Sequence, residues 1–255
     1  MAFSAARARL ALVAILLALT ALAWWLTAAR MVGMDAGPGT DVGAVGWFLG
    51  IWAVMMAAMM LPSLAPTVAL YGRMTDERDW TRPLLFAGGY LLVWAAGGLV
   101  AYGLFRVGKS VLGDDLEWRS GGQFVAGGVL AVAALYELTP PKHLCLARCR
   151  SPLGLLLSTW RDGRLGALEM GSRHAAWCVG CCWALMAALF ALGMMSLTWM
   201  AFVAALIAIE KTLPWCRVAT WGTATVLLAL AVAVVAAPHG VPGLVVPGAT
   251  HRAMG

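Results

Sequence analysis

Charged residues are scarce in this sequence of 255 residues: 12% are Asp, Glu, Lys or Arg, whereas 62% are hydrophobic. A soluble domain has about 25% charged residues, so this composition excludes an ordinary soluble protein. Several apolar runs approach or exceed about 18 residues, which is long enough to cross a bilayer as a helix. The alternating segments of a membrane β-barrel are absent. The sequence therefore predicts an all-α integral membrane protein, with residues 1–255 in a single membrane domain.

The sequence also lacks the motifs of energy-coupled and nucleic-acid-binding proteins. It contains no GxxxxGK[ST] phosphate loop, no Asp-Lys-Thr-Gly phosphorylation motif of a P-type pump, and no RNA- or DNA-binding motif. In a membrane protein the net charge of +6 mainly reports orientation. We therefore expect no nucleic-acid partner, and any transport would need a gradient or an acceptor.

About seven transmembrane helices are expected, or six if the first is removed or the sixth is not a full span. They cover residues 8–28, 43–62, 84–105, 121–138, 175–195, 198–213 and 218–237. The first run is too long for a cleaved signal peptide, which favours a retained helix. The segment 238–255 is rich in Gly and Pro and is expected to be a flexible tail.

The distribution of Lys and Arg predicts the orientation. With the N-terminus in the cytoplasm, 13 of the 18 basic residues fall in inner segments and five in outer ones. This bias predicts a multi-pass membrane protein with its C-terminus outside the cytoplasm. It also makes residues 139–174 a cytoplasmic loop that contains cysteines.

Five of the six cysteines lie between Cys145 and Cys182, a clustering that favours metal binding or redox chemistry over scattered disulfides. Cys145 and Cys149 are four residues apart, so one helical turn would place both sulfurs on one face. His143 would lie on the far side of such a helix. The alternative is a pair of unremarkable thiols in a basic loop.

A second cysteine group follows in the stretch RHAAWCVGCCWALM. At about 100° per residue, His174, Cys178 and Cys181 fall within an arc of about 60°, with Cys182 beside them. An imidazole and two or three thiols on one stripe make a site suited to a soft metal ion. The alternative is small cysteines that pack between transmembrane helices.

Four methionines occupy six positions in the stretch MMAAMMLPS. Met55 with Met59, and Met56 with Met60, are i,i+4 pairs whose thioethers can meet. Prolines 62 and 66 follow, and a helix distorted by proline near thioethers indicates a lined cavity. Thioethers suit copper(I) and are poor ligands for zinc or magnesium. The alternative is a helix-packing stripe of flexible side chains.

Three charged residues near the inner surface, Glu137, Glu210 and Lys211, are interpreted as interfacial charges that face water or pair locally. Cys216 is predicted on the same side as the cysteine clusters. We assign no role to Cys216, His143, Glu137 or Glu210 from the sequence.

Four blocks together resemble one bacterial family of predicted metal-binding integral membrane proteins. They are MMAAMMLPS at 55–63, KHLCLARCRSP at 142–152, RHAAWCVGCCWALM at 173–186 and EKTLPW at 210–215. That family is similar to a membrane copper chaperone that serves a bacterial tyrosinase (polyphenol oxidase). The resemblance covers residues 50–217. It implies copper delivery to a cuproenzyme such as tyrosinase or cytochrome oxidase, with the methionine block, the cysteine blocks and His174 as ligands.

The sequence thus predicts a copper(I)-binding membrane chaperone that is not an enzyme and that delivers its ion to an apo-cuproenzyme. The alternative is a membrane thiol–disulfide oxidoreductase that uses the C-x-x-C pair Cys178–Cys181, because a helix start can lower the pKa of a thiol. A further possibility is a structural subunit whose sulfur content is incidental.

Overall fold

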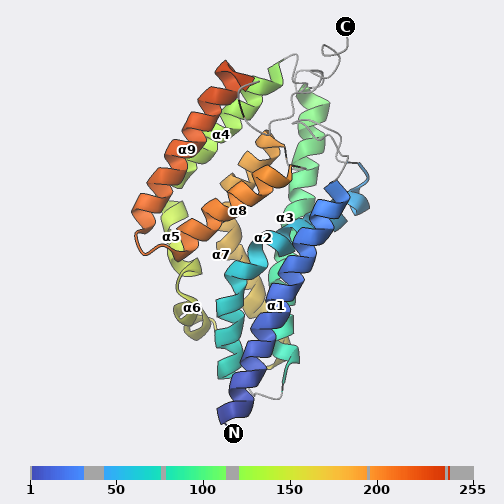
Figure 1. Ribbon diagram of the computed structural model, residues 1–255, viewed down its shortest axis with the longest axis vertical. Helices are drawn as coiled ribbons and strands as arrows, with labels where there is room; N and C mark the ends of the chain where they lie inside the picture. The colour runs from blue at the N-terminus through green and yellow to red at the C-terminus, as the bar shows by residue number, and fades with distance from the viewer. Residues whose placement is uncertain are drawn as a thin grey trace. The chain divides into compact units, whose positions relative to one another are not determined.

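The computed structural model describes residues 2–31, 43–75, 79–112, 121–193, 196–238 and 241. Every regular element in these residues is helical (Figure 1), which confirms the all-α prediction. The helices are α1 (Ala2–Met31), α2 (Val45–Met74), α3 (Thr81–Leu112), α4 (Gln123–Glu137), α5 (Pro140–Cys149), α6 (Pro152–Ser158), α7 (Gly163–Leu192), α8 (Leu197–Thr212) and α9 (Cys216–Ala236). Nearly all of the predicted tail lies outside the described residues.

Five helices are long and apolar enough to cross a membrane: α1, α2, α3, α7 and α9. The helices α4 and α5 meet at a bend of 69° and together qualify as a sixth, broken span. Helix α8, at 16 residues, falls short of a full span. The protein is therefore a polytopic helical membrane protein with five or six candidate spans. The count of six equals the lower number that the sequence allowed.

Large apolar side chains are exposed along the outer faces of these helices. On α9, Val218, Trp221, Leu228 and Val232 are more than half exposed. A soluble protein rarely exposes apolar residues in such continuous rows. Such a surface is stable in the hydrocarbon of a membrane, because lipid tails contact apolar side chains favourably.

Helix α7 begins at Gly163, twelve residues before its predicted start. The basic residues there indicated a loop, but they lie on helical turns that extend beyond the apolar run. Glu169 accepts ion pairs from Arg161 at 2.8 Å and from Arg173 at 2.9 Å. The pair with Arg173 joins successive turns and supports the helix. With α5 and α6, this extension makes the predicted loop 139–174 largely helical.

Helix α2 continues through both of its prolines to Met74, although the sequence predicted an end at residue 62. Proline removes one backbone hydrogen bond, but transmembrane helices tolerate it where neighbouring groups satisfy the freed carbonyls. The Ser63 hydroxyl adds a hydrogen bond to the Met60 carbonyl at 2.9 Å within the same stretch. The prolines therefore lie inside a continuous buried helix.

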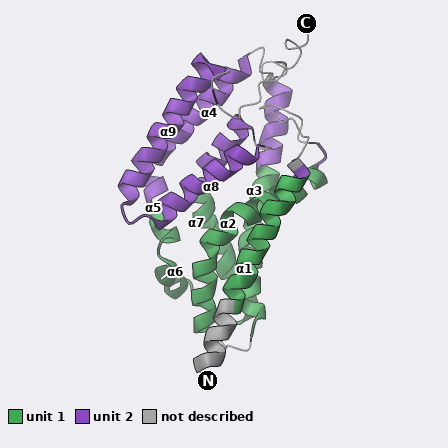
Figure 2. Ribbon diagram, in the orientation of Figure 1, with its two compact units in different colours: residues 1–29, 45–100, 144–181 green, residues 30–44, 101–143, 182–255 purple. Residues whose placement is uncertain are grey.

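The chain forms two compact units (Figure 2). Unit 1 comprises residues 1–29, 45–100 and 144–181, and unit 2 comprises residues 30–44, 101–143 and 182–255. In unit 1, α3 and α7 approach so closely that glycine is required at their crossing. A Cβ added at Gly89 would stand 2.1 Å from the Leu168 carbonyl oxygen, and one at Gly171 would stand 1.9 Å from that of Phe86.

Helices α2 and α3 of unit 1 are joined by aromatic contacts at two levels. The Trp52 indole donates a hydrogen bond to the Trp94 carbonyl at 2.7 Å. Further along, the rings of Tyr71 and Phe86 stack with centroids 5.1 Å apart. From the first pair to the second, the residue numbers rise along α2 and fall along α3, so the two helices are antiparallel here. In unit 2, α9 packs against α4 and α8.

Candidate metal centre

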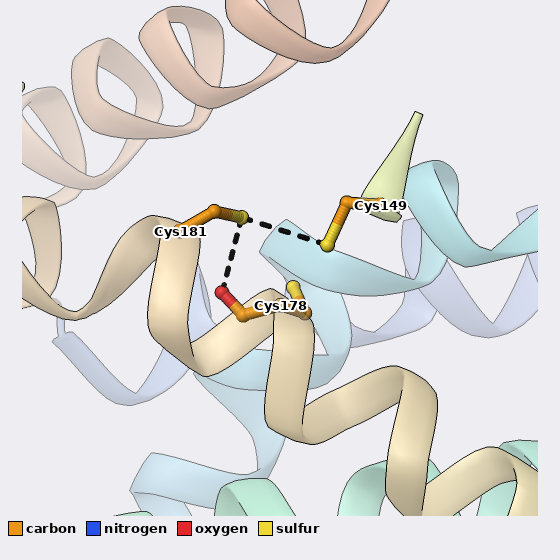
Figure 3. A group of neighbouring side chains, drawn as sticks. All are labelled: Cys149, Cys178 and Cys181. Carbon is orange, nitrogen blue, oxygen red and sulfur yellow. Dashed lines mark hydrogen bonds between the residues drawn. The ribbon is translucent and has the colours of Figure 1, made fainter. Parts of the chain in front are cut away.

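Three thiols from two helices of unit 1 lie together (Figure 3). The sulfur atoms of Cys149 on α5 and of Cys178 and Cys181 on α7 are all within 4.8 Å of one another. The Cys149 and Cys181 sulfurs are 3.7 Å apart, and the Cys181 thiol also donates to the Cys178 carbonyl at 3.2 Å. Two cysteines three residues apart share one helix face, so α7 supplies a pair and α5 supplies the third thiol.

Cys145 lies beside this group, one turn before Cys149 on α5. Its sulfur would be 2.7 Å from a Cβ placed on Gly180, within the CVGCC stretch. Glycine at this position therefore gives the α5 thiols room to approach α7. This contact and the Cys149–Cys181 contact bring the two cysteine blocks of the sequence together.

Burial differs between the thiols of the two helices. Cys178 and Cys181 are buried, at 0% and 1% exposure, whereas Cys145 and Cys149 are half-buried. An ion held by all three clustered sulfurs would thus have two buried ligands and one that solvent or a partner can approach.

His174 and Cys182 are both buried, and both lie outside the group of three. His174 packs against the rings of Phe86 and Tyr90, with centroids 6.2 and 5.7 Å away. Cys182 is assigned to unit 2, where its thiol is within electrostatic range of the Lys142 ammonium. Their roles as ligands stay predictions.

The four methionines of α2 are all buried, between 0% and 4% exposed. Together they cover an arc of about 140° of the helix. They are buried on the stretch of α2 that lies between the Trp52–Trp94 and Tyr71–Phe86 contacts. Because packing and ligation both require burial, their assignment as ligands also stays a prediction.

One residue near the thiols was not identified from the sequence. The Tyr90 hydroxyl on α3 lies 2.9 Å from the Cys178 sulfur, and both side chains are fully buried. The sequence of α3 has no motif that distinguishes Tyr90 from a packing residue, because a tyrosine in an apolar run also fits ordinary helix packing.

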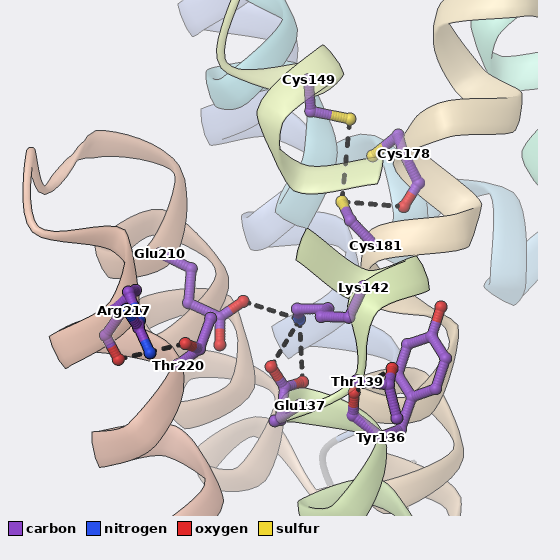
Figure 4. Close-up of polar contacts among 10 residues, drawn as sticks. All are labelled: Tyr136, Glu137, Thr139, Lys142, Cys149, Cys178, Cys181, Glu210, Arg217 and Thr220. Atoms are coloured by element: carbon purple, nitrogen blue, oxygen red, sulfur yellow. Dashed lines mark hydrogen bonds and ion pairs between the residues drawn. The ribbon is translucent and has the colours of Figure 1, made fainter. Parts of the chain in front are cut away.

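A buried ion network in unit 2 was also missed (Figure 4). The Lys142 ammonium lies 2.8 and 2.7 Å from the two carboxylate oxygens of Glu137 and 2.8 Å from Glu210. All three residues are at most 2% exposed. Of the two predicted alternatives, facing water is therefore wrong for both carboxylates: Glu137 pairs locally with Lys142, and Glu210 pairs with Lys142 at long range. The network joins α4, α5 and α8 across 68 residues of sequence, which no local pattern reveals.

The donor set determines what the thiol cluster can bind. Thiolates are ligands for soft or borderline metal ions, copper(I), zinc and iron–sulfur iron among them. A thiolate and a cation partly cancel in charge, which lowers the cost of burying both near hydrocarbon. Fold and site together define a polytopic membrane protein with a buried thiol cluster suited to a soft metal ion.

Comparison with known proteins identifies the family. The PpoB2 family, described as copper chaperones, matches residues 49–234, and the chain belongs to it. The match includes all four methionines and every clustered cysteine, and it confirms the family resemblance found in the sequence. Family membership implies a role in handling copper rather than in catalysis. Neither a curated protein nor a solved structure matches the chain.

The ion network predicts the effect of removing its single cation. Lys142→Met would remove the cation that pairs with two buried carboxylates, and breaking a buried pair in this way costs about 3–5 kcal/mol. We expect the variant to unfold at clearly lower temperature or denaturant concentration than the wild type in detergent.

The control is the triple variant Lys142→Met/Glu137→Gln/Glu210→Gln, which removes every charge of the network. Because no unpaired charge remains, it should recover most of the lost stability. Equal stability of the single variant and the wild type would contradict the importance of the network.

Proposed function

We propose that the protein holds copper(I) on Cys149, Cys178 and Cys181 and passes it to an apo-cuproenzyme of the tyrosinase or cytochrome oxidase kind. The single observation that supports this is the cluster of three sulfurs within 4.8 Å in a member of a copper chaperone family. Copper is the cargo, so the site must release the ion as well as bind it.

The oxidation state follows from the ligands. Sulfur donors, thiolate and thioether alike, select copper(I) over harder ions. Copper(I) would also survive among free thiols, which tend to reduce copper(II). A cluster of three thiols in a buried setting therefore supports copper(I) as the bound form.

Ligand exchange can begin at α5. Cys149 is half-buried, so an incoming donor can reach it before it reaches the buried pair on α7. Cys145, one turn away and packed against Gly180, is placed to act as the neighbouring thiol in such an exchange. Cys182 and His174 are further candidate ligands on the turns that flank the buried pair.

The methionine block is the proposed handoff position. On α2 the block lies between Trp52 and Tyr71, which contact Trp94 and Phe86 of α3. On α3, Tyr90 lies between Trp94 and Phe86. The block and Tyr90 thus lie along the same stretch of this antiparallel helix pair, and Tyr90 contacts Cys178 on α7. Thioethers bind copper(I) more weakly than thiolates do, which suits release.

The thiol cluster is proposed to lie toward the cytoplasm, with the N-terminus inside and the C-terminus outside. The bias of 13 basic residues against five supports this orientation. Cytosolic reductants would also keep the closely spaced thiols reduced and available for copper.

The first prediction tests the thiolate site. In Cys178→Ser/Cys181→Ser, copper(I) affinity should fall at least about tenfold, since changes to outer-shell partners alone cost that much. The measurement is copper retained by purified protein against a strong copper(I) chelator under anaerobic conditions. Cys216→Ser, which removes a half-buried thiol outside the cluster, is the control. Undiminished retention in the folded double variant would refute the site.

A second prediction separates the thioethers from the thiolates. Met55→Leu/Met59→Leu roughly preserves volume, with a cost typically under about 1.5 kcal/mol per swap. The variant should insert and load copper normally, yet fail to support a copper-dependent oxidase in cells at limiting copper.

Its control is Met186→Leu/Met200→Leu, which changes two buried methionines outside α2. This control should support wild-type oxidase activity. If both double variants match the wild type at normal abundance, the methionines of α2 serve only in packing.

Orientation gives a third prediction. The Arg161 side chain is 59% exposed between α6 and α7, so a reporter can be inserted there with little disturbance. A reporter that is active only outside the cytoplasm should stay silent at this position and be active when fused after residue 255. Activity at Arg161 would reverse the proposed topology.

A further inference from the structure

We propose that Tyr90 is a positioning residue that sets how readily Cys178 releases copper. This inference rests on the proposed function and concerns the rate of transfer from the thiolate site. Its observation is the contact of 2.9 Å between the Tyr90 hydroxyl and the Cys178 sulfur.

The contact is built into the core of unit 1. Tyr90 and Cys178 are each 0% exposed, so water does not compete for either group. The Tyr90 ring also packs against His174, one turn before Cys178, with centroids 5.7 Å apart. Two contacts with α7 therefore fix the direction in which the hydroxyl points.

Metal binding decides the direction of this hydrogen bond. While Cys178 is a thiol, either group can be the donor. Copper binds the thiolate, which has no proton, so in the loaded site only the Tyr90 O–H can donate. A hydrogen bond to a charged acceptor is stronger than one between neutral groups.

The strength of this bond changes as copper leaves. A sulfur bound to copper(I) shares its negative charge with the metal, and it regains that charge as the bond breaks. The hydrogen bond from Tyr90 therefore stabilises the departing thiolate more than the bound one. Tyr90 thus lowers the barrier to release at Cys178, so that the ion can move to the next ligand without a co-reactant.

The test is the rate of copper(I) transfer from the full-length protein in detergent to a chelator, measured by stopped flow. Tyr90→Phe removes only the hydroxyl and should slow transfer about tenfold, the effect of losing a hydrogen bond to a charged group. The copper–thiolate absorption should also shift to longer wavelength, because the sulfur loses a hydrogen-bond donor. A fluorinated tyrosine at position 90, a stronger donor of similar size, should speed transfer.

Tyr102→Phe is the matched control on the same helix, because the Tyr102 hydroxyl donates to the Gly43 carbonyl at 3.1 Å and not to a thiol. It should match the wild type in both rate and spectrum. An unchanged rate in Tyr90→Phe, or a changed rate without a spectral shift, would overturn the inference. If the wild type itself retains no copper, the proposed function fails instead, and the two failures are thereby distinguished.

Discussion

A single lysine ammonium between two carboxylates joins the start of α5 to α4 and α8, and α5 supplies Cys149 to the thiol cluster. Lys142 is fully buried and joins Glu137 of α4 and Glu210 of α8. In an apolar setting such a network is stable only while all members are present, so it constrains these helices strongly. Cys145 and Cys149 follow on the next two turns of the same helix. The helix that carries these two thiols therefore begins in a buried ion network.

The proposed sulfur ligands differ in accessibility and in strength, and both differences would bear on transfer. Half-buried thiols on α5 meet buried thiols on α7, and buried thioethers occupy α2. Driving copper(I) off a strong thiolate site in one step would require an energy source. Exchange between adjacent soft ligands provides a route that needs none, because each new bond forms as an old one breaks. Fast release then requires a weakened thiolate, and a buried hydroxyl beside Cys178 is the group suited to that task.

The sequence predicted the features that depend on local spacing. The helical class, the i,i+4 methionine pairs and the Cys178–Cys181 pair all follow from the period of the helix and from hydropathy. Contacts between helices did not follow from it. Glu137 and Glu210 resembled interfacial charges because their partner, Lys142, lies on a third helix, and Tyr90 had no mark in its own segment. The start of α7 was predicted too late for a different reason. Charged residues at the end of an apolar run indicate that the membrane span has ended, but the helix itself can continue into water when its charges pair. Glu169 and Arg173 form such a pair on α7.

The geometry of the thiols also bears on the oxidoreductase alternative. The close pair is Cys149 with Cys181, 3.7 Å apart and from different helices, rather than an isolated C-x-x-C. Closing a disulfide there would consume two of the three clustered sulfurs and destroy the soft-metal site. A copper chaperone with this arrangement is therefore compatible only with a reducing environment, whereas a disulfide donor requires an oxidising one. The distribution of basic residues favours the cytoplasmic side for the cluster. That side is reducing, so thiols would stay reduced there. The proposed cytoplasmic position of the cluster agrees with its need for reduced thiols.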